Sequence, residues 1–259
     1  MFKPHTVTFD CWQTLIYESH SPTQALTKSR VQLLSERTDK SRDAVQAAFD
    51  AAWREHQRAW HRQIAFGSHE MTDHVLSTLG IDMPAGARAA LVAELEDEML
   101  SHTVIAIDGT RELLATLREA GVRVALICDT GFSPGRVVRQ LLDRVGLLEH
   151  LEVQIFSDEV RAPKPSLKAF KAALDGLGVE ARGAVHVGDL RRSDIAGARA
   201  AGMGAVRFRG RNDDASQDRS AAGILDCTTA GCVPVCERPE GDAVVSSYAE
   251  LAAYLRNAF

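Results

Sequence analysis

Three aspartates and one lysine in this sequence have the types and surroundings of residues that could act together on one ligand. Asp10, Asp189 and Lys164 lie at or shortly after the ends of short apolar runs, and Asp194 lies a few residues beyond Asp189. If the runs are parallel strands of one sheet, their carboxyl ends meet at the edge where such sheets bind ligands. Three carboxylates against one ammonium leave a surplus of negative charge, which a divalent cation would balance.

The elements that must position these residues are apolar runs that alternate with segments of helical periodicity. We expect strands at residues 7–9, 122–127, 153–156, 184–187, 205–208 and 243–245, and helices at 112–119, 134–145, 167–177, 195–201 and 248–255. Ser133 is the expected N-cap of the second of these helices, with Pro134 in its first position. Alternation at this spacing predicts an α/β fold, a parallel sheet covered by helices on both faces.

A long helical insertion separates the first strand from the rest of the sheet. Between about residues 21 and 102 apolar residues recur at three- and four-residue steps, as in Val45, Phe49 and Ala52, without a convincing strand pattern. We therefore divide the chain into a core of residues 1–16 and 106–259 and a helical cap of residues 17–105.

Four segments, taken in order, resemble the motifs of the haloacid dehalogenase superfamily: FDCWQTL, LICDTG, APKPS and HVGDLRRSD. Each is short, but their order, their positions at strand ends and the Lys-Pro step together are typical of the family. The resemblance covers nearly the whole chain, because the helical insertion lies where the family places a cap. It implies a hydrolase with a Rossmann-like parallel-sheet core and an inserted α-helical cap domain.

The resemblance also implies roles for the charged residues. In the family the first-motif aspartate, matched by Asp10, attacks the substrate and forms a covalent aspartyl intermediate. Lys164 would offset the repulsion between that carboxylate and an anionic substrate. Mg²⁺ would be held by oxygen ligands, namely Asp10, Asp189, Asp194 and the backbone carbonyl of Trp12. Asp194 could instead cap the helix that follows it.

Trp12 leaves the type of reaction open. The phosphatases of the superfamily carry a second aspartate at this position, and losing such a general acid/base commonly costs about 10²–10⁴ in rate. The haloacid dehalogenases carry an aromatic residue there, because halide leaves without a proton. They need no metal, however, and usually lack the first aspartate of the fourth motif, whereas Gly188-Asp189 is intact here. Nearby, Gln13 replaces a usual glycine, and Thr14 is expected to tie the loop after Asp10.

The expected substrate-binding residues also depart from the family pattern. Cys128 stands where serine or threonine ordinarily contacts the substrate anion, and a thiol is a poor donor. Asp129 follows it, and Thr130 could substitute if the loop is shifted. Trp12 is expected beside the substrate. Arg54, on a helix rich in aromatic and basic residues, loosely matches the cap arginine that binds the substrate carboxylate in the dehalogenases. Helix packing explains the tryptophans of that helix at least as well.

The composition limits the class of protein. The 259 residues carry a formal net charge of -5, and no patch of like charge suggests a nucleic-acid partner. No apolar run approaches the roughly 18 residues that span a membrane, and no signal peptide is evident. We expect a cytoplasmic protein with free thiols. Cys227, Cys232 and Cys236 could bind zinc, although their spacing is not a usual one.

Three functions follow from these patterns. The first is Mg²⁺-dependent hydrolysis of a small phosphorylated metabolite through Asp10. The second is metal-independent dehalogenation or a related hydrolysis of a small acid. The third is a ligand- or partner-binding protein with little catalysis. In each case the partner is a small anionic molecule that the cap selects, and the oligomeric state stays open.

Overall fold

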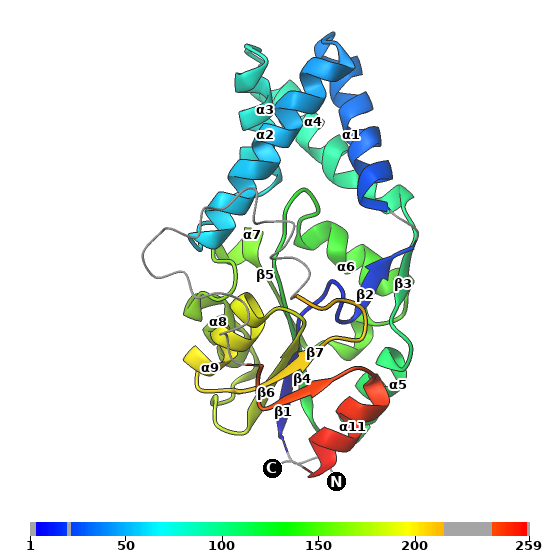
Figure 1. Ribbon diagram of the computed structural model, residues 1–259, viewed down its shortest axis with the longest axis vertical. Helices are drawn as coiled ribbons and strands as arrows, with labels where there is room; N and C mark the ends of the chain where they lie inside the picture. Colours follow the sequence, from blue (N-terminus) through cyan, green and yellow to red (C-terminus); the bar gives the residue numbers. More distant parts are fainter. Residues whose placement is uncertain (1–3, 20–21, 215–239, 258–259) are drawn as a thin grey trace.

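The computed structural model describes residues 4–19, 22–214 and 240–257. Its core is a six-stranded sheet in the order β5-β4-β1-β6-β7-β8, with every neighbouring pair parallel (Figure 1). The strands are β1 (Thr6–Phe9), β4 (Arg123–Cys128), β5 (Val153–Phe156), β6 (Ala184–Gly188), β7 (Gly204–Phe208) and β8 (Ala243–Val245). The predicted α/β fold is confirmed, and no end of these six strands lies more than one residue from its expected position.

Helices bury both faces of the sheet, which explains why the central strands β1 and β6 are apolar or buried at every position. One face packs on α5 (Thr110–Glu119), α6 (Gly135–Arg144) and α11 (Tyr248–Asn257), and the other on α8 (Leu167–Leu177) and α9 (Ala196–Ala200) (Figure 1). A single-turn helix, α7 (Ser157–Val160), follows β5 directly. The sheet therefore exposes its strand ends, rather than its faces, to ligands.

The start of α6 differs from the prediction. Pro134, not Ser133, is the N-cap residue, and its side chain makes no capping hydrogen bond. The Ser133 hydroxyl instead accepts a hydrogen bond from Arg30 Nη2 at 3.3 Å. The backbone N–H of Gly135, which has no partner within the helix, donates to the Asp158 carboxylate at 3.2 Å. Ser133 therefore bonds to Arg30 instead of capping α6, and Asp158 of α7 accepts the N–H at the start of the helix in its place.

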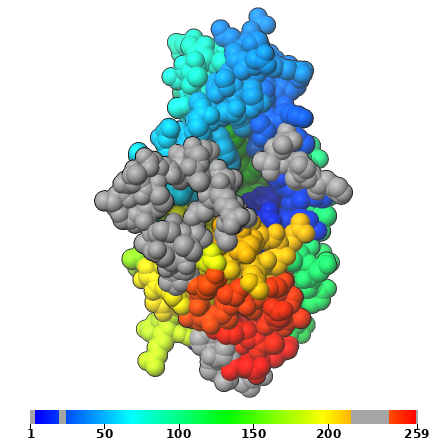
Figure 2. Space-filling model, in the orientation of Figure 1, coloured from blue at the N-terminus to red at the C-terminus, as the bar shows by residue number. Residues whose placement is uncertain are grey.

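Among the described residues, four α-helices and the short 3₁₀ helix η1 (Glu98–Ser101) lie between the two strands of a small antiparallel ribbon, β2 (Ile16–Glu18) and β3 (Val104–Ala106), a pair that the sequence did not predict. The α-helices are α1 (Pro22–Thr38), α2 (Arg42–His61), α3 (Ser68–Thr78) and α4 (Ala85–Asp97). They pack around their own apolar cluster and stand above the core, and we call them the cap (Figures 1 and 2). The proposed domain limits, residues 17–105 and the remainder, stay a prediction.

The loop that follows β4 enters the cap. Phe132, 2% exposed, belongs to the apolar cluster of the cap and stacks on Phe49 with ring centroids 5.0 Å apart. The Arg30 guanidinium also lies over the Phe132 ring, 5.0 Å from its centroid. On α6, Arg136 forms an ion pair with the buried Glu96 of α4 at 2.6 Å. Core and cap are therefore joined by side chains as well as by the ribbon.

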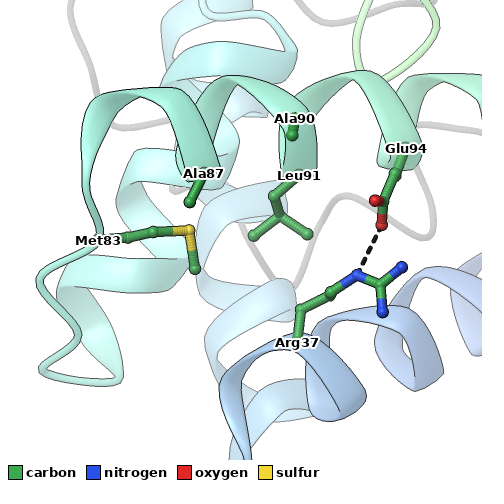
Figure 3. Close-up of a pocket in the computed structure, with 6 residues that line it drawn as sticks. All are labelled: Arg37, Met83, Ala87, Ala90, Leu91 and Glu94. Atoms are coloured by element: carbon green, nitrogen blue, oxygen red, sulfur yellow. Dashed lines mark hydrogen bonds and ion pairs between the residues drawn. The ribbon is translucent and has the colours of Figure 1, made fainter.

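A hollow of about 240 Å³ lies within the cap, between α1 and α4 (Figure 3). The ion pair between Arg37 Nε and Glu94 Oε2, 2.8 Å long, spans it. None of the residues predicted to form the catalytic site lines this hollow. Among the described residues, no helix has the length and apolar character needed to cross a membrane.

Candidate active site

Asp10 lies directly after β1, where the strand ends at the open edge of the sheet. Its backbone N–H donates to the Val187 carbonyl of β6 at 2.8 Å, which fixes the residue between strands. One carboxylate oxygen, Oδ2, accepts a hydrogen bond from the Thr14 hydroxyl at 3.0 Å. Gln13 has a φ of 62°, the left-handed conformation that glycine adopts most easily. Gln13 thus adopts this conformation in spite of its side chain, and Thr14 ties the loop to Asp10 as expected.

Lys164 brings its ammonium between two of the aspartates. Nζ lies 2.5 Å from Asp10 Oδ1 and 2.7 Å from Asp194 Oδ1, and the side chain is 2% exposed. Burial alone would lower the pKa of Lys164, but the charges of Asp10 and Asp194 outweigh it and raise this pKa well above its usual value. The lysine is therefore a fixed positive charge beside Asp10.

Asp189 and Asp194 are held by the loop and helical turn that follow β6. Asp194 accepts hydrogen bonds from the Leu190 backbone N–H at 3.0 Å and from His186 at 3.1 Å. It sits inside the turn Arg191–Ile195 and bonds backwards, so it does not act as the N-cap that we had considered. A Cβ on Gly188 would lie 2.3 Å from the Asp194 carboxyl carbon, so glycine is needed for this approach.

The carboxylates of Asp10, Asp189 and Asp194 form a compact group of negative charge. Ligand atoms of Asp10, Asp189 and Asp194 all lie within 4.8 Å of one another, and all three residues are buried. Burial, together with the charges of Asp10 and Asp194, raises the pKa of Asp189 well above its usual value. Burial also raises the pKa of Asp194, but Lys164 and His186 more than reverse this and lower it. A hard divalent cation would relieve the repulsion at Asp189, so these residues fit Mg²⁺.

Residues of the loop after β7 support this group from outside. Asn212 Nδ2 donates to Asp189 Oδ2 at 2.8 Å. The loop is anchored by Asp214, which accepts hydrogen bonds from the Arg191 backbone and from its guanidinium at 2.8 and 2.6 Å. Arg207, 1% exposed, also bonds Asp214. Sequence reasoning missed these residues, since they and their partners are far apart along the chain.

Trp12 is partly buried and packs on two apolar clusters. One is the cluster beneath α5, α6 and α11. The other joins the lower part of the cap to α6 and consists of Leu26, Met99, Val104, Val137 and Leu141. The indole therefore fills the joint between cap and core, a packing role that an aspartate at this position could not perform.

The predicted substrate-binding residues after β4 already have partners within the protein. The Cys128 thiol is 1% exposed and donates to the Asp129 carbonyl at 3.4 Å. A hydrogen bond with the Cys11 thiol and burial raise the pKa of Cys128 well above its usual value, so it stays protonated. The Thr130 hydroxyl lies 3.0 Å from Ser157 Oγ and donates to Asp158 at 2.9 Å. The expected use of Thr130 in place of a second-motif serine therefore competes with these bonds.

Trp60 of the cap also contacts this loop, although helix packing explained the tryptophans of its helix at least as well from the sequence. Its Nε1–H donates to Asp129 Oδ2 at 2.7 Å. The guanidinium of Arg192, two residues before Asp194, lies 3.6 Å from the centroid of its ring. Arg54, the candidate from the same helix, is exposed. The enrichment in aromatic and basic residues singled out this helix in the sequence, but spacing alone could not select the residue that contacts Asp129.

The family model described as haloacid dehalogenase-like hydrolase matches residues 4–202, most of the chain. The chain belongs to this family. Human haloacid dehalogenase-like hydrolase domain-containing protein 3 is 30% identical over 208 residues, which cover 76% of this chain and 78% of that protein. The expected superfamily and its hydrolase class are thus confirmed.

Two further proteins are similar to this chain, one in the sequence of a part of it and one in its fold. Glyceraldehyde 3-phosphate phosphatase from Pyrococcus abyssi is 38% identical over 103 residues, 40% of this chain and only 42% of that protein. The crystal structure of 2-haloacid dehalogenase from Pseudomonas syringae pv. Tomato DC3000 has a TM-score of 0.64, 20% identity and full coverage of both chains. The latter likeness concerns the fold alone.

Proposed function

We propose that the protein is a Mg²⁺-dependent phosphatase that acts on a small phosphorylated metabolite through Asp10. The observation that carries this proposal is the group of three buried carboxylates opposed by Lys164 at the carboxyl ends of β1 and β6. Such a surplus of buried negative charge is costly without a cation. The similarity to a protein named glyceraldehyde 3-phosphate phosphatase supports phosphate as the group transferred.

In the proposed reaction an Asp10 carboxylate oxygen attacks the phosphorus atom, and the bond between phosphorus and the leaving oxygen breaks. The aspartyl-phosphate formed is then hydrolysed by water, which returns Asp10 and releases inorganic phosphate. Mg²⁺ held by Asp10, Asp189 and Asp194, together with the Trp12 carbonyl, would supply positive charge for the phosphate oxygens. Lys164 keeps Asp10 oriented and offsets its charge, while Thr14 holds its other oxygen.

Trp12 shapes the expected substrate range. It cannot give the leaving group a proton, so acyl and aryl phosphates, whose leaving groups depart as stable anions, should react fastest. The same aromatic residue favours the second candidate, metal-independent dehalogenation of a small 2-halo acid. The third candidate, a binding protein with little catalysis, predicts no turnover of either class. We further propose that the enzyme works in the cytoplasm, because Cys11 and Cys128 are free thiols.

One panel of assays separates the candidates. An aryl phosphate, an alkyl phosphate and a 2-halo acid are each incubated with the wild type and Asp10→Asn, with Mg²⁺ or with a chelator. We expect phosphate release from the aryl ester that requires both Asp10 and Mg²⁺. Asp175→Asn is the matched control, because Asp175 is an exposed aspartate on α8 that pairs with Lys171. Halide release that survives chelation and requires Asp10 would establish the dehalogenase instead.

A further inference from the structure

The Asp129 carboxylate joins the cap to the loop that carries Lys164. Its Oδ2 accepts the Trp60 indole N–H at 2.7 Å, and its Oδ1 accepts the backbone N–H of Lys164 at 2.8 Å. Each oxygen thus has a donor from a different part of the protein, one on α2 and one in the loop between α7 and α8. Both donors need an acceptor, so the position calls for a carboxylate rather than an amide.

The hydrogen bond between Asp129 and the Lys164 backbone cannot be replaced by one from a neighbouring residue of the loop. Pro163 and Pro165 flank the lysine, and proline has no backbone N–H. The N–H of Lys164 is therefore the one main-chain donor in this tripeptide, and Asp129 accepts it. The same residue places its ammonium 2.5 Å from Asp10 Oδ1. A shift of the backbone at this point would move the charge away from the proposed nucleophile.

Trp60 is held in the position that this bond requires. It lies in the last turn of α2, and the Arg192 guanidinium stacks on its ring at 3.6 Å. Arg192 belongs to the turn that also carries Asp194, the second partner of the Lys164 ammonium. The indole therefore contacts two of the core segments that build the catalytic group.

We propose that Trp60 and Asp129 are positioning residues that make the placement of Lys164 depend on the docking of the cap on the core. The proposal rests on the proposed phosphatase function for its kinetic consequences, but not for its structural ones. In the docked arrangement Trp60 holds Asp129, Asp129 holds the Lys164 backbone, and the ammonium lies against Asp10. Without the bond from Trp60, the Asp129 carboxylate would be free to rotate, and the backbone of Lys164 would be held less firmly.

The kinetic test uses Mg²⁺-dependent hydrolysis of an aryl phosphate. Trp60→Phe keeps a ring for Arg192 but removes the N–H, and Asp129→Asn keeps one acceptor for Lys164 but presents an amide N–H₂ to the indole. Each should lower kcat by about 3- to 10-fold, the size expected for one buried hydrogen bond, with KM nearly unchanged. The double variant should be no slower than either single one, because both remove the same bond. Asp129→Ala, which removes both bonds, should be slower still.

A second measurement needs no activity. Acetylation of lysines with a water-soluble reagent, followed by peptide mass spectrometry, should modify the buried Lys164 slowly in the wild type and several-fold faster in Trp60→Phe. Lys171, whose side chain is 73% exposed, serves as the internal standard. Arg42→Gln, an exposed change in the first turn of the same helix, should leave both labelling and kcat as in the wild type.

The two measurements separate the positioning role from the phosphatase itself. A wild type without phosphatase activity would refute the proposed function, while faster Lys164 labelling in Trp60→Phe would still support the positioning role. Unchanged labelling in Trp60→Phe would overturn that role. A raised KM with unchanged kcat would also overturn it, because it would mean that Trp60 only lines the substrate pocket.

Discussion

Replacement of Lys164 by methionine tests the electrostatic balance on which the proposed site depends. The ammonium lies 2.5 Å from Asp10 Oδ1 and 2.7 Å from Asp194 Oδ1, and the exposed fractions of the three side chains are 2%, 10% and 1%. Removal of one partner from such a buried ionic group costs about 3–5 kcal/mol, because the remaining charges stay buried and unbalanced. For a chain of this size each kcal/mol shifts Tm by about 2–4 °C, so Lys164→Met should melt about 6–20 °C below the wild type.

The assay is thermal unfolding in a chelating buffer and again with millimolar Mg²⁺. The decrease in Tm caused by Lys164→Met should be smaller with Mg²⁺, because the cation balances part of the negative charge. It should also be smaller at pH 5, because the carboxylates left without Lys164 gain protons more readily there. Lys171→Met is the matched control, because the Lys171–Asp175 pair is exposed and is worth less than about 1 kcal/mol. If Lys164→Met in chelator melted like Lys171→Met, the surplus of negative charge would not exist as described.

Three further perturbations test other parts of the site. Millimolar Mg²⁺ should raise the Tm of the wild type by binding the folded state, and Asp189→Asn should abolish that gain in the same thermal scan. Trp12→Asp should lower Tm, because the indole packs on two apolar clusters, yet accelerate alkyl phosphates selectively, by at most about 10²–10⁴; equal effects on aryl and alkyl esters would argue against a missing acid. Burial lowers the pKa of His56, so its proton favours the unfolded chain. The stability difference between the wild type and His56→Gln should be fully present above pH 6.5 and should shrink as the pH falls below it, which urea unfolding at pH 5, 6, 7 and 8 would show.

The convergence of Asp10, Lys164, Asp189 and Asp194 could be predicted because it follows from local patterns. An apolar run that ends in a carboxylate marks a strand end, and parallel strands bring their carboxyl ends to one edge whatever their separation along the chain. The register of the sheet determines which residues meet at that edge. Phe9 of β1 pairs with Val187 of β6, and this pairing places Asp10 near Asp189. What these residues do chemically stays a prediction.

The contacts of Trp60, Phe132 and Asn212 could not be predicted in the same way. Each depends on how one element meets another that is distant in sequence, and neither periodicity nor spacing contains that information. Trp60 belongs to a helix that was correctly expected, but only the docked cap brings it to Asp129. The unexpected N-cap of α6 has the same origin. Arg30, from the helical cap, donates a hydrogen bond to Ser133, which was expected to be the N-cap residue of this helix. Cys227, Cys232 and Cys236 lie outside the described residues.

The insertion of Phe132 into the cap has a consequence for protein engineering. Relatives of this fold invite recombination, in which the helices of one protein are grafted onto the sheet of another to transfer substrate selectivity. In this protein such a graft would remove the packing of Phe132 on Phe49. Arg30 would lose its contacts with the Phe132 ring and with Ser133. A graft that keeps these contacts therefore has to carry Phe132 and Ser133 together with the cap, although the sequence keeps the two stretches of chain apart.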